Sequence, residues 1–118
     1  MTVKECYDAM GGNYDEVLSR LRDDTRIAKF LGKILADPSY ELLVTSIANN
    51  NAEEAFRAAH TIKGICLNLA VTKLYGSSNA LTEALRGKSE ITDEAHKLLE
   101  AVTNDYNATI DSIKRLQA

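Results

Sequence analysis

The sequence predicts an all-α protein, an antiparallel up-down four-helix bundle with additional short helices at its N-terminus. Apolar residues recur at intervals of three and four, the helical period, along most of the chain. Asparagine or aspartate precedes several of these segments, where each can cap a helix. The chain has one proline and no long alternating run of valine or isoleucine, which argues against a sheet. We expect one domain, with N-terminal helices in residues 1–36 and the bundle in residues 37–118.

The composition excludes several classes of protein. The chain has 118 residues, of which 45% are hydrophobic and 26% charged, values that are ordinary for a single folded domain. No apolar run approaches the ~20 residues of a membrane-spanning helix, and no apolar signal-peptide core follows Met1. A formal net charge of −3 argues against general nucleic-acid binding, which needs an excess of basic residues. We therefore expect a cytoplasmic protein that binds neither membranes nor nucleic acids.

Two short helices are expected at the N-terminus. The first runs from Val3 to about Met10 and is ended by a pair of glycines. Asn13, with Glu16 three residues later, has the form of a capping box and opens the second. We expect the two helices to form a lid on the larger bundle. The residues expected to face inward are Val3, Cys6, Tyr7 and Met10, then Tyr14, Val17, Leu18 and Leu21.

A proline separates the next two helices. Asp23 or Asp24 can cap a helix that continues until Asp37 and Pro38 interrupt it. Asp37 as the cap and Pro38 at the first helical position then start the following helix, which ends in the turn 49–51. The expected inward residues are Ile27, Phe30, Leu31, Ile34 and Leu35, then Tyr40, Leu43, Val44 and Ile47.

The last two helices carry long apolar stripes. One runs from about Thr72 to Arg86 and stops at Gly87, and the other begins near Thr92 and is ~35 Å long. Short connections between the later helices favour antiparallel neighbours. The expected inward residues are Leu74, Ser78, Leu81 and Leu85, then Ala95, Leu98, Leu99, Val102, Tyr106, Ile110, Ile113 and Leu116.

The helix between the asparagine turn and about Ala70 has the strongest start signal. Asn51 with Glu54, or Asn50 with Glu53, forms a capping box. Small and apolar residues then recur on one side of the helix, which should therefore face the core. These residues are Ala55, Ala58, Ala59, Ile62, Ile65, Cys66 and Leu69.

The outer face of this helix carries a histidine among unusual neighbours. At about 100° per residue, His60 points away from the apolar stripe and into solvent. Gly64 shares this face, where a helical glycine costs about 1 kcal/mol relative to alanine, so it is either a packing glycine or a place where something must come close. Phe56 and Leu67 are apolar residues on the same face, covered either by a partner or by the N-terminal helices. The charged residues of the face are Glu53, Arg57 and Lys63.

The exposed imidazole suggests nucleophilic chemistry. In its neutral form one ring nitrogen keeps a free lone pair. Lys63, one turn beyond His60, would disfavour protonation of the ring and attract an anion placed on it. Arg57, on the preceding turn, would add to this field, unless both cations are ordinary solvated charges. A phosphoryl group is the anion that fits this arrangement.

No second reactive site is predicted. The two cysteines, Cys6 and Cys66, lie far apart in the chain, and Cys66 is on the core side of its helix, so a buried free thiol is expected instead of a disulfide or a metal ligand. His96 lies at the edge of the last apolar stripe and is expected on the surface. Because the chain offers no cluster of ligands, we expect no bound metal.

Three stretches carry a family resemblance: Ala59-His60-Thr61-Ile62-Lys63-Gly64, Asn68-Leu69 with Leu74, and Leu81-Thr82-Glu83-Ala84-Leu85-Arg86. Together they resemble the signature of the histidine phosphotransfer (HPt) domains of two-component phosphorelays. The resemblance covers about Asp37 to Leu116 and implies a four-helix bundle preceded by variable N-terminal helices. It also implies that His60 accepts a phosphoryl group from an aspartyl phosphate of a receiver domain, or from a kinase histidine, and passes it to another receiver.

The resemblance implies roles for the neighbours of His60. Lys63 would help to neutralise the phosphoryl group, and Gly64 would leave room for the receiver. The residues expected to form the docking rim are Phe56, Arg57 and Leu67. In the family a polar residue of the next helix often supports the histidine, and the candidates here are Asn79, Thr82 and Arg86. The departures from the family, which usually has small residues and a glycine at these places, are Ile65, Cys66 and Ala70.

The sequence thus predicts a phosphocarrier and not an enzyme, because it shows no Gly-rich phosphate loop or nucleotide site. No cofactor is expected on this chain, and magnesium would be held by the receiver. The expected partners are response-regulator receiver domains and hybrid histidine kinases, and we expect a free-standing monomer. The alternative is a docking or adaptor bundle that binds a receiver or kinase through the same face without being phosphorylated.

Overall fold

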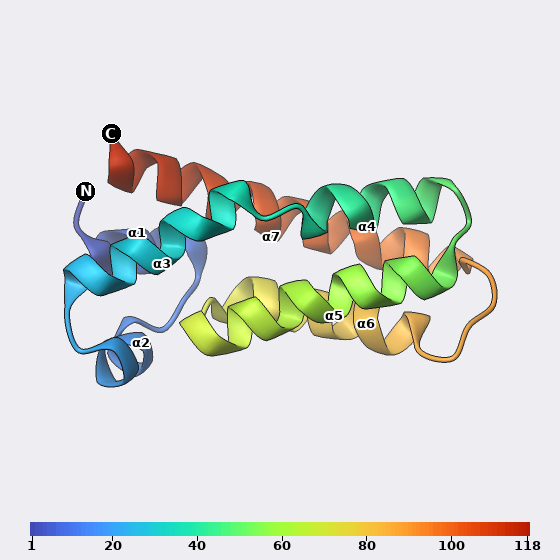
Figure 1. The fold of residues 1–118 in the computed structure, drawn as a ribbon, viewed down its shortest axis with the longest axis horizontal. Helices are drawn as coiled ribbons and strands as arrows, with labels where there is room; N and C mark the ends of the chain where they lie inside the picture. The colour runs from blue at the N-terminus through green and yellow to red at the C-terminus, as the bar shows by residue number, and fades with distance from the viewer.

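The fold consists of α-helices joined by short connections, so the predicted all-α class is confirmed. The computed structural model describes all of residues 1–118. No helix combines the length and the apolar character that crossing a bilayer requires. The helices are α1 (Val3–Met10), α2 (Tyr14–Leu21), α3 (Asp24–Ala36), α4 (Ser39–Ala48), α5 (Ala52–Leu69), α6 (Thr72–Leu85) and α7 (Asp93–Gln117) (Figure 1).

The longest helix, α7, extends along most of the molecule. Its 25 residues span about 37 Å at 1.5 Å per residue, and the longest extent of the protein is 43 Å. In Figure 1, α4, α5 and α6 form the bundle with the first part of α7, whereas α1 and α3 pack on its C-terminal part. The predicted up-down bundle with extra N-terminal helices is therefore confirmed.

Side chains cap most of the helices at their N-termini. Each accepts a hydrogen bond from a backbone N–H in the first turn, a contribution of about 1 kcal/mol per helix. The N-cap of α5 is Asn51 and not Asn50, because Asn51 Oδ1 accepts a hydrogen bond from the Glu54 N–H at 3.1 Å. The capping residues are Thr2, Asn13, Asp23, Asn51 and Thr92.

The start of α4 differs from the prediction by one residue. Pro38 is the N-cap and not the first helical residue, because its carbonyl accepts the first helical hydrogen bond, from the Leu42 N–H at 3.0 Å. Asp37 lies one position further out and closes α3, but its carboxylate still accepts from the Ser39 N–H at 2.8 Å. The break leaves α3 and α4 one after the other along the same edge of the molecule in Figure 1.

The core is formed along the predicted apolar stripes, and one residue predicted to face inward does not. Val44 is 38% exposed, whereas Ser39 and Ser46 are buried. These serines lie a heptad apart beside Leu43 and Ile47, so α4 is rotated to place small side chains against its neighbours. The largest fully buried side chains are Tyr7, Met10, Ile27, Leu31, Leu43, Leu74, Leu81, Leu85 and Ile113.

The C-terminal end of α5 is tied to the N-terminal helices. Ala70 caps α5 in the left-handed conformation, with φ 56°, although a side chain there costs about 1 kcal/mol. The Ala70 carbonyl accepts from the Asn13 N–H at 2.8 Å, and the hydroxyl of buried Tyr7 donates to the Leu69 carbonyl at 2.7 Å. The last turn of α5 is therefore held by α1 and by the connection to α2.

Both cysteines are buried free thiols, as predicted for Cys66. Burial raises the pKa of Cys66 to about 12 and also raises the pKa of Cys6. Because the thiolate is the reactive form, both side chains are inert packing residues at neutral pH.

Candidate functional site

Helix α5 presents His60 to solvent, as its periodicity predicts. The opposite side of the helix is made of small residues, and Ala55 and Ala59 are fully buried. Small side chains let α5 approach its neighbours closely, so it lies directly against α4 and α6 (Figure 1). The imidazole therefore stands on a rigid, well-packed helix and remains accessible.

The ring of Phe56 supports the imidazole. Phe56 precedes His60 by one turn, and the two rings are parallel, with an interplanar angle of 5° and centroids 5.8 Å apart. The guanidinium of Arg86, which follows the end of α6, lies over the Phe56 ring at 5.1 Å from its centroid. Phe56 thus contacts both groups and limits the orientations that His60 can adopt.

A single carboxylate gathers the cations beside His60. Arg86 donates to both oxygens of Glu83, with Nε and Nη2 each 3.1 Å away. Lys63 Nζ approaches the same carboxylate at 4.0 Å, and its side chain is only 21% exposed. The hydrogen bonds from Arg86 hold the pKa of Glu83 below its ordinary value, and the charges of Lys63 and His60 act in the same direction. No role was predicted for Glu83 from the sequence, although its position three residues before Arg86 is a signal for such a pair.

Arg57 does not join this group. Its guanidinium bonds to Glu54 Oε1 at 2.7 Å and to Glu53 Oε1 at 2.5 Å, both in the first turn of α5. Two carboxylates therefore compensate its charge. The positive field expected beside His60 comes from Lys63 and Arg86 instead.

Gly64 leaves open space on the face of His60. A Cβ atom built at this position meets no heavy atom within 4 Å. The interpretation of Gly64 as a packing glycine is therefore wrong, because nothing packs against it. The helix bears the cost of glycine, about 1 kcal/mol, without a compensating contact inside the protein.

The three candidates for support on α6 lie in different environments. The hydroxyl of Thr82 is buried and donates to the Ser78 carbonyl at 2.7 Å, so it is used within its own helix. Asn79 is half-buried. Arg86 is the candidate that the structure brings to the ring of Phe56 and to Glu83.

The two apolar residues of the face are covered to different degrees. Phe56 is half-buried under Arg86, a residue just beyond α6 and not from the N-terminal helices. Leu67 remains 51% exposed. From α2, Arg20 reaches the end of α5 and donates to the Leu67 carbonyl at 2.7 Å without covering the Leu67 side chain. The N-terminal helices therefore do not close this face.

The arrangement can perform nucleophilic chemistry on an anionic group. An accessible imidazole lies next to two cations, and open surface adjoins it at Gly64. No group of three or more histidine, cysteine, aspartate or glutamate side chains could hold a metal ion. The second histidine, His96, is exposed on α7, in agreement with the prediction.

Comparison with known proteins assigns the family. The family model described as the Hpt domain matches residues 16–115. No curated protein and no solved structure matches the chain. The matched region begins inside α2, so it also contains α3, whereas the sequence resemblance extended only from about Asp37. With this match over most of its length and an all-helical bundle that presents a histidine, the chain belongs to the Hpt domain family, a family of phosphotransfer modules.

Proposed function

We propose that this protein is a phosphocarrier in which His60 accepts a phosphoryl group from a receiver aspartyl phosphate, or from a kinase histidine, and passes it to another receiver. The observation that carries the proposal is the position of the accessible imidazole. It is stacked on Phe56, and Glu83 holds two cations beside it.

The transfer step needs only a neutral imidazole. A ring nitrogen uses its lone pair to attack the phosphorus, the N–P bond forms, and the bond from phosphorus to the aspartyl oxygen breaks. The receiver carboxylate leaves with that electron pair, and the ring proton on the other nitrogen can pass to water. The reverse reaction loads a second receiver. In this proposal the receiver holds the magnesium ion, and this chain supplies position and charge.

Lys63 and Arg86 are the residues that would neutralise the phosphoryl group. A phosphoryl group carries a charge of roughly −1.5 to −2 at neutral pH, more than the single charge of Glu83. Both cations can therefore exchange Glu83 for the phosphoryl oxygens when His60 is modified. Arg57 contributes less, because its guanidinium is already bound to Glu53 and Glu54.

The surface around His60 suits a docked receiver. Gly64 presents bare backbone one turn beyond the histidine, and a Cβ there would project into the space a partner must occupy. Leu67, two turns beyond His60, has an exposed apolar side chain. Phe56 lies one turn before His60. These contacts line up along one face of α5.

Phosphorylation of His60 tests the proposal directly. Incubation with a phosphorylated receiver should give acid-labile, base-stable phosphate on the wild type and none on His60→Gln. His96→Gln is the matched control, because it removes the other exposed histidine, and it should behave like the wild type. Equal labelling of wild type and His60→Gln would refute the proposal. Receiver binding without any labelling would favour the docking bundle.

A further inference from the structure

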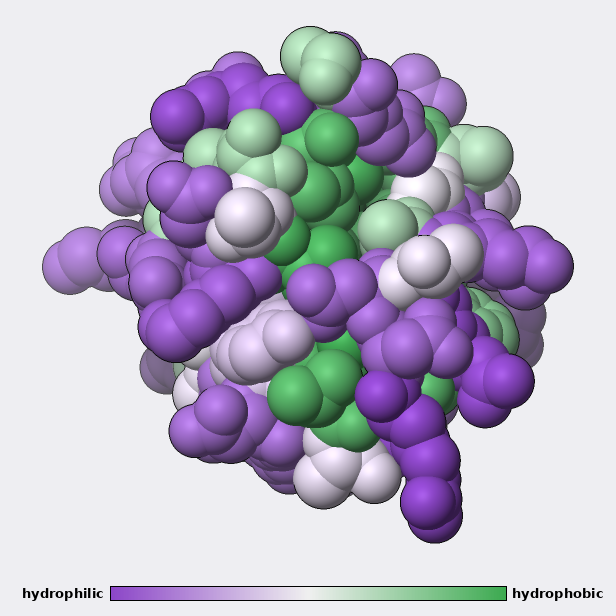
Figure 2. Space-filling model, turned by 90° about the vertical axis from the view of Figure 1, so that its left-hand side faces the viewer, coloured by the Kyte–Doolittle hydropathy of each residue, from purple (hydrophilic) through white to green (hydrophobic).

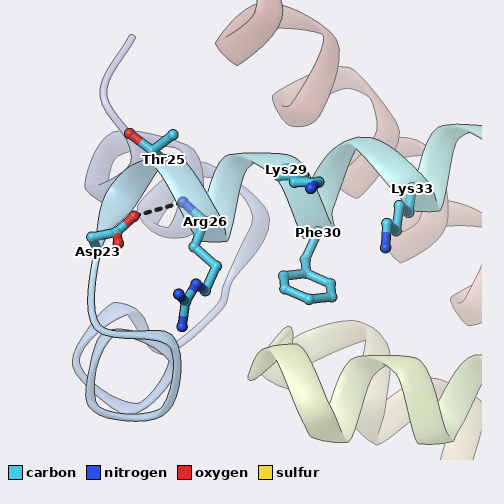
Figure 3. Close-up of a pocket in the computed structure, with 6 residues that line it drawn as sticks. All are labelled: Asp23, Thr25, Arg26, Lys29, Phe30 and Lys33. Carbon is cyan, nitrogen blue, oxygen red and sulfur yellow. Dashed lines mark hydrogen bonds between the residues drawn. The ribbon is translucent and has the colours of Figure 1, made fainter.

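A groove with a basic rim lies between α3 and the C-terminal end of α5, the helix that carries His60. Its first part is a hollow of about 500 Å³ along α3, and a second hollow of about 290 Å³ continues it toward α5. Phe30 and Lys33 line both hollows, so the two are continuous. Figure 3 shows Phe30 and Lys33 pointing from α3 toward the end of α5, and Arg26 pointing from the same helix toward α2.

The floor of the groove is apolar. It is formed by Leu21 from α2, Phe30 from α3, and Ile65 and Leu69 from α5. All but Leu69 remain partly exposed. Figure 2 views the molecule from this end and shows a band of hydrophobic side chains within a hydrophilic surface.

The rim of the groove is basic in a protein that is acidic as a whole. Residues 20–33 carry five basic and two acidic side chains, a net charge of +3, whereas the whole chain carries −3 and the remaining residues therefore −6. Lys33 Nζ lies over the Phe30 ring at 4.7 Å. The basic residues of this segment that form no ion pair within the protein are Arg22, Arg26, Lys29 and Lys33. Their charges are free to meet acidic groups from outside.

The groove is within reach of a partner docked on His60. Asn68, which borders the groove, is eight residues beyond His60 and therefore about 12 Å further along α5. A folded domain of 100 residues has a radius of gyration of about 13 Å, so one domain can cover both places.

We propose that this groove binds an acidic segment, bearing large apolar side chains, of the protein that exchanges phosphoryl groups with His60. Carboxylates on the segment pair with Arg26 and Lys33, which lie seven residues and therefore about 10 Å apart along α3. An apolar side chain between these carboxylates packs on Phe30. The groove would thus add affinity and partner selection outside the transfer site. The identity of the partner rests on the proposed function, but the groove can be tested without it.

The test is binding of a labelled synthetic peptide in which glutamates flank a central pair of leucines. Fluorescence polarisation should show that the protein binds this peptide and that the binding weakens at high salt. The double variant Arg26→Glu/Lys33→Glu should lose about tenfold in affinity. The matched control is Lys88→Glu/Lys97→Glu, which reverses two exposed, unpaired lysines away from the groove and should bind like the wild type. Circular dichroism checks that each variant is folded.

Several results would overturn the inference. One is an equal loss of peptide affinity in the two double variants. The others are wild-type affinity for a peptide with glutamine in place of glutamate, or for a peptide with serine in place of leucine. Binding of phosphatidylserine vesicles through Arg26 and Lys33, without peptide binding, would assign the groove to a membrane surface instead.

The peptide assay also separates this inference from the proposed function. His60→Gln should bind the peptide normally, because His60 lies outside the groove. Phosphoramidate, a small phosphoryl donor, should label Arg26→Glu/Lys33→Glu at the wild-type rate. A protein that binds the peptide but is never phosphorylated would refute the proposed function and leave the groove intact.

Discussion

Glu83 organises the charges around His60 at the scale of single residues. Its carboxylate accepts two hydrogen bonds from Arg86 and lies 4.0 Å from Lys63, so both cations are held at the edge of α5 before any phosphoryl group arrives. The Glu83 carboxylate positions Lys63 and Arg86, but it would also compete with a phosphoryl group for them. In the proposed transfer, Glu83 is therefore expected to act through Lys63 and Arg86, as a positioning residue.

Glu83→Gln should free Lys63 and Arg86 to bind the phosphoryl group. We expect phosphohistidine made with phosphoramidate to survive several-fold longer than in the wild type, measured by phosphorus NMR, with the gain reduced at high salt. Glu100→Gln, at an exposed position on α7, is the control. An unchanged or shorter lifetime would show that Glu83 does not compete with the phosphoryl group.

The same carboxylate should leave a signature in the pH dependence of stability. The pKa of Glu83 is lowered in the folded state, so its stabilisation is present above the ordinary value of 4.5 and is lost as the pH falls through the lower folded value. Denaturant unfolding should therefore separate wild type from Glu83→Gln at neutral pH and bring them together in acid. A difference that persists in acid would assign the effect to something other than this charge.

At the scale of the helix, α5 combines a close-packed inner side with an outer side that is left bare. Ala55 and Ala59 are fully buried, whereas a Cβ at Gly64 would meet nothing. Because glycine weakens a helix interior, the bare position lowers the stability of the element that carries the histidine. The gain expected in return is access for a receiver.

Gly64→Gln should stabilise the protein and slow transfer. Replacing a helical glycine should raise the free energy of unfolding by roughly 0.5–1 kcal/mol. Transfer from a phosphorylated receiver should slow tenfold or more, about 1.4 kcal/mol, while labelling by phosphoramidate stays unchanged. The control is Gly76→Gln on α6, where a Cβ also meets no atom within 4 Å. Normal transfer in the Gly64 variant would remove the clearance explanation.

At the scale of the whole molecule, the N-terminal helices hold the end of the helix that carries the site. Tyr7 is fully buried, and its hydroxyl bonds to the last turn of α5 through Leu69. The Ala70 carbonyl, just beyond, accepts from Asn13. Deletion of α1 would therefore remove the donor of the Leu69 carbonyl at the end of α5.

Tyr7→Phe should destabilise the whole protein by about 1–2 kcal/mol, because the Leu69 carbonyl loses its buried donor. Tyr75→Phe is the control, since the Tyr75 hydroxyl makes no hydrogen bond within the protein. Burial raises the pKa of Tyr7 above 10.0, so the folded state holds this proton more tightly than the unfolded state. The free energy of unfolding should then fall as the pH rises above 10.0, with a smaller fall in Tyr7→Phe. Equal alkaline slopes would exclude Tyr7 as the source.

The sequence by itself determined the helices and the outward position of His60, because these follow from local periodicity, and it determined the asparagine and aspartate caps, because these follow from residue type. Asn51, one of the two predicted caps, begins α5, the last helix begins near Thr92 as expected, and Gly64 shares the face of His60. Only the tertiary structure decided that Glu83 binds both Lys63 and Arg86, since that depends on how α6 lies against α5.

The packing of the helices against one another also explains the other differences between the sequence predictions and the structure. Val44 faces solvent because the small serines of α4 turn the helix, and Arg57 binds the first turn of α5 because two carboxylates lie within its reach there. The groove between α3 and α5 exists because Phe30 and Ile65, far apart in the chain, line a common space. Periodicity determines which face of a helix is apolar, whereas only packing determines which neighbour that face meets.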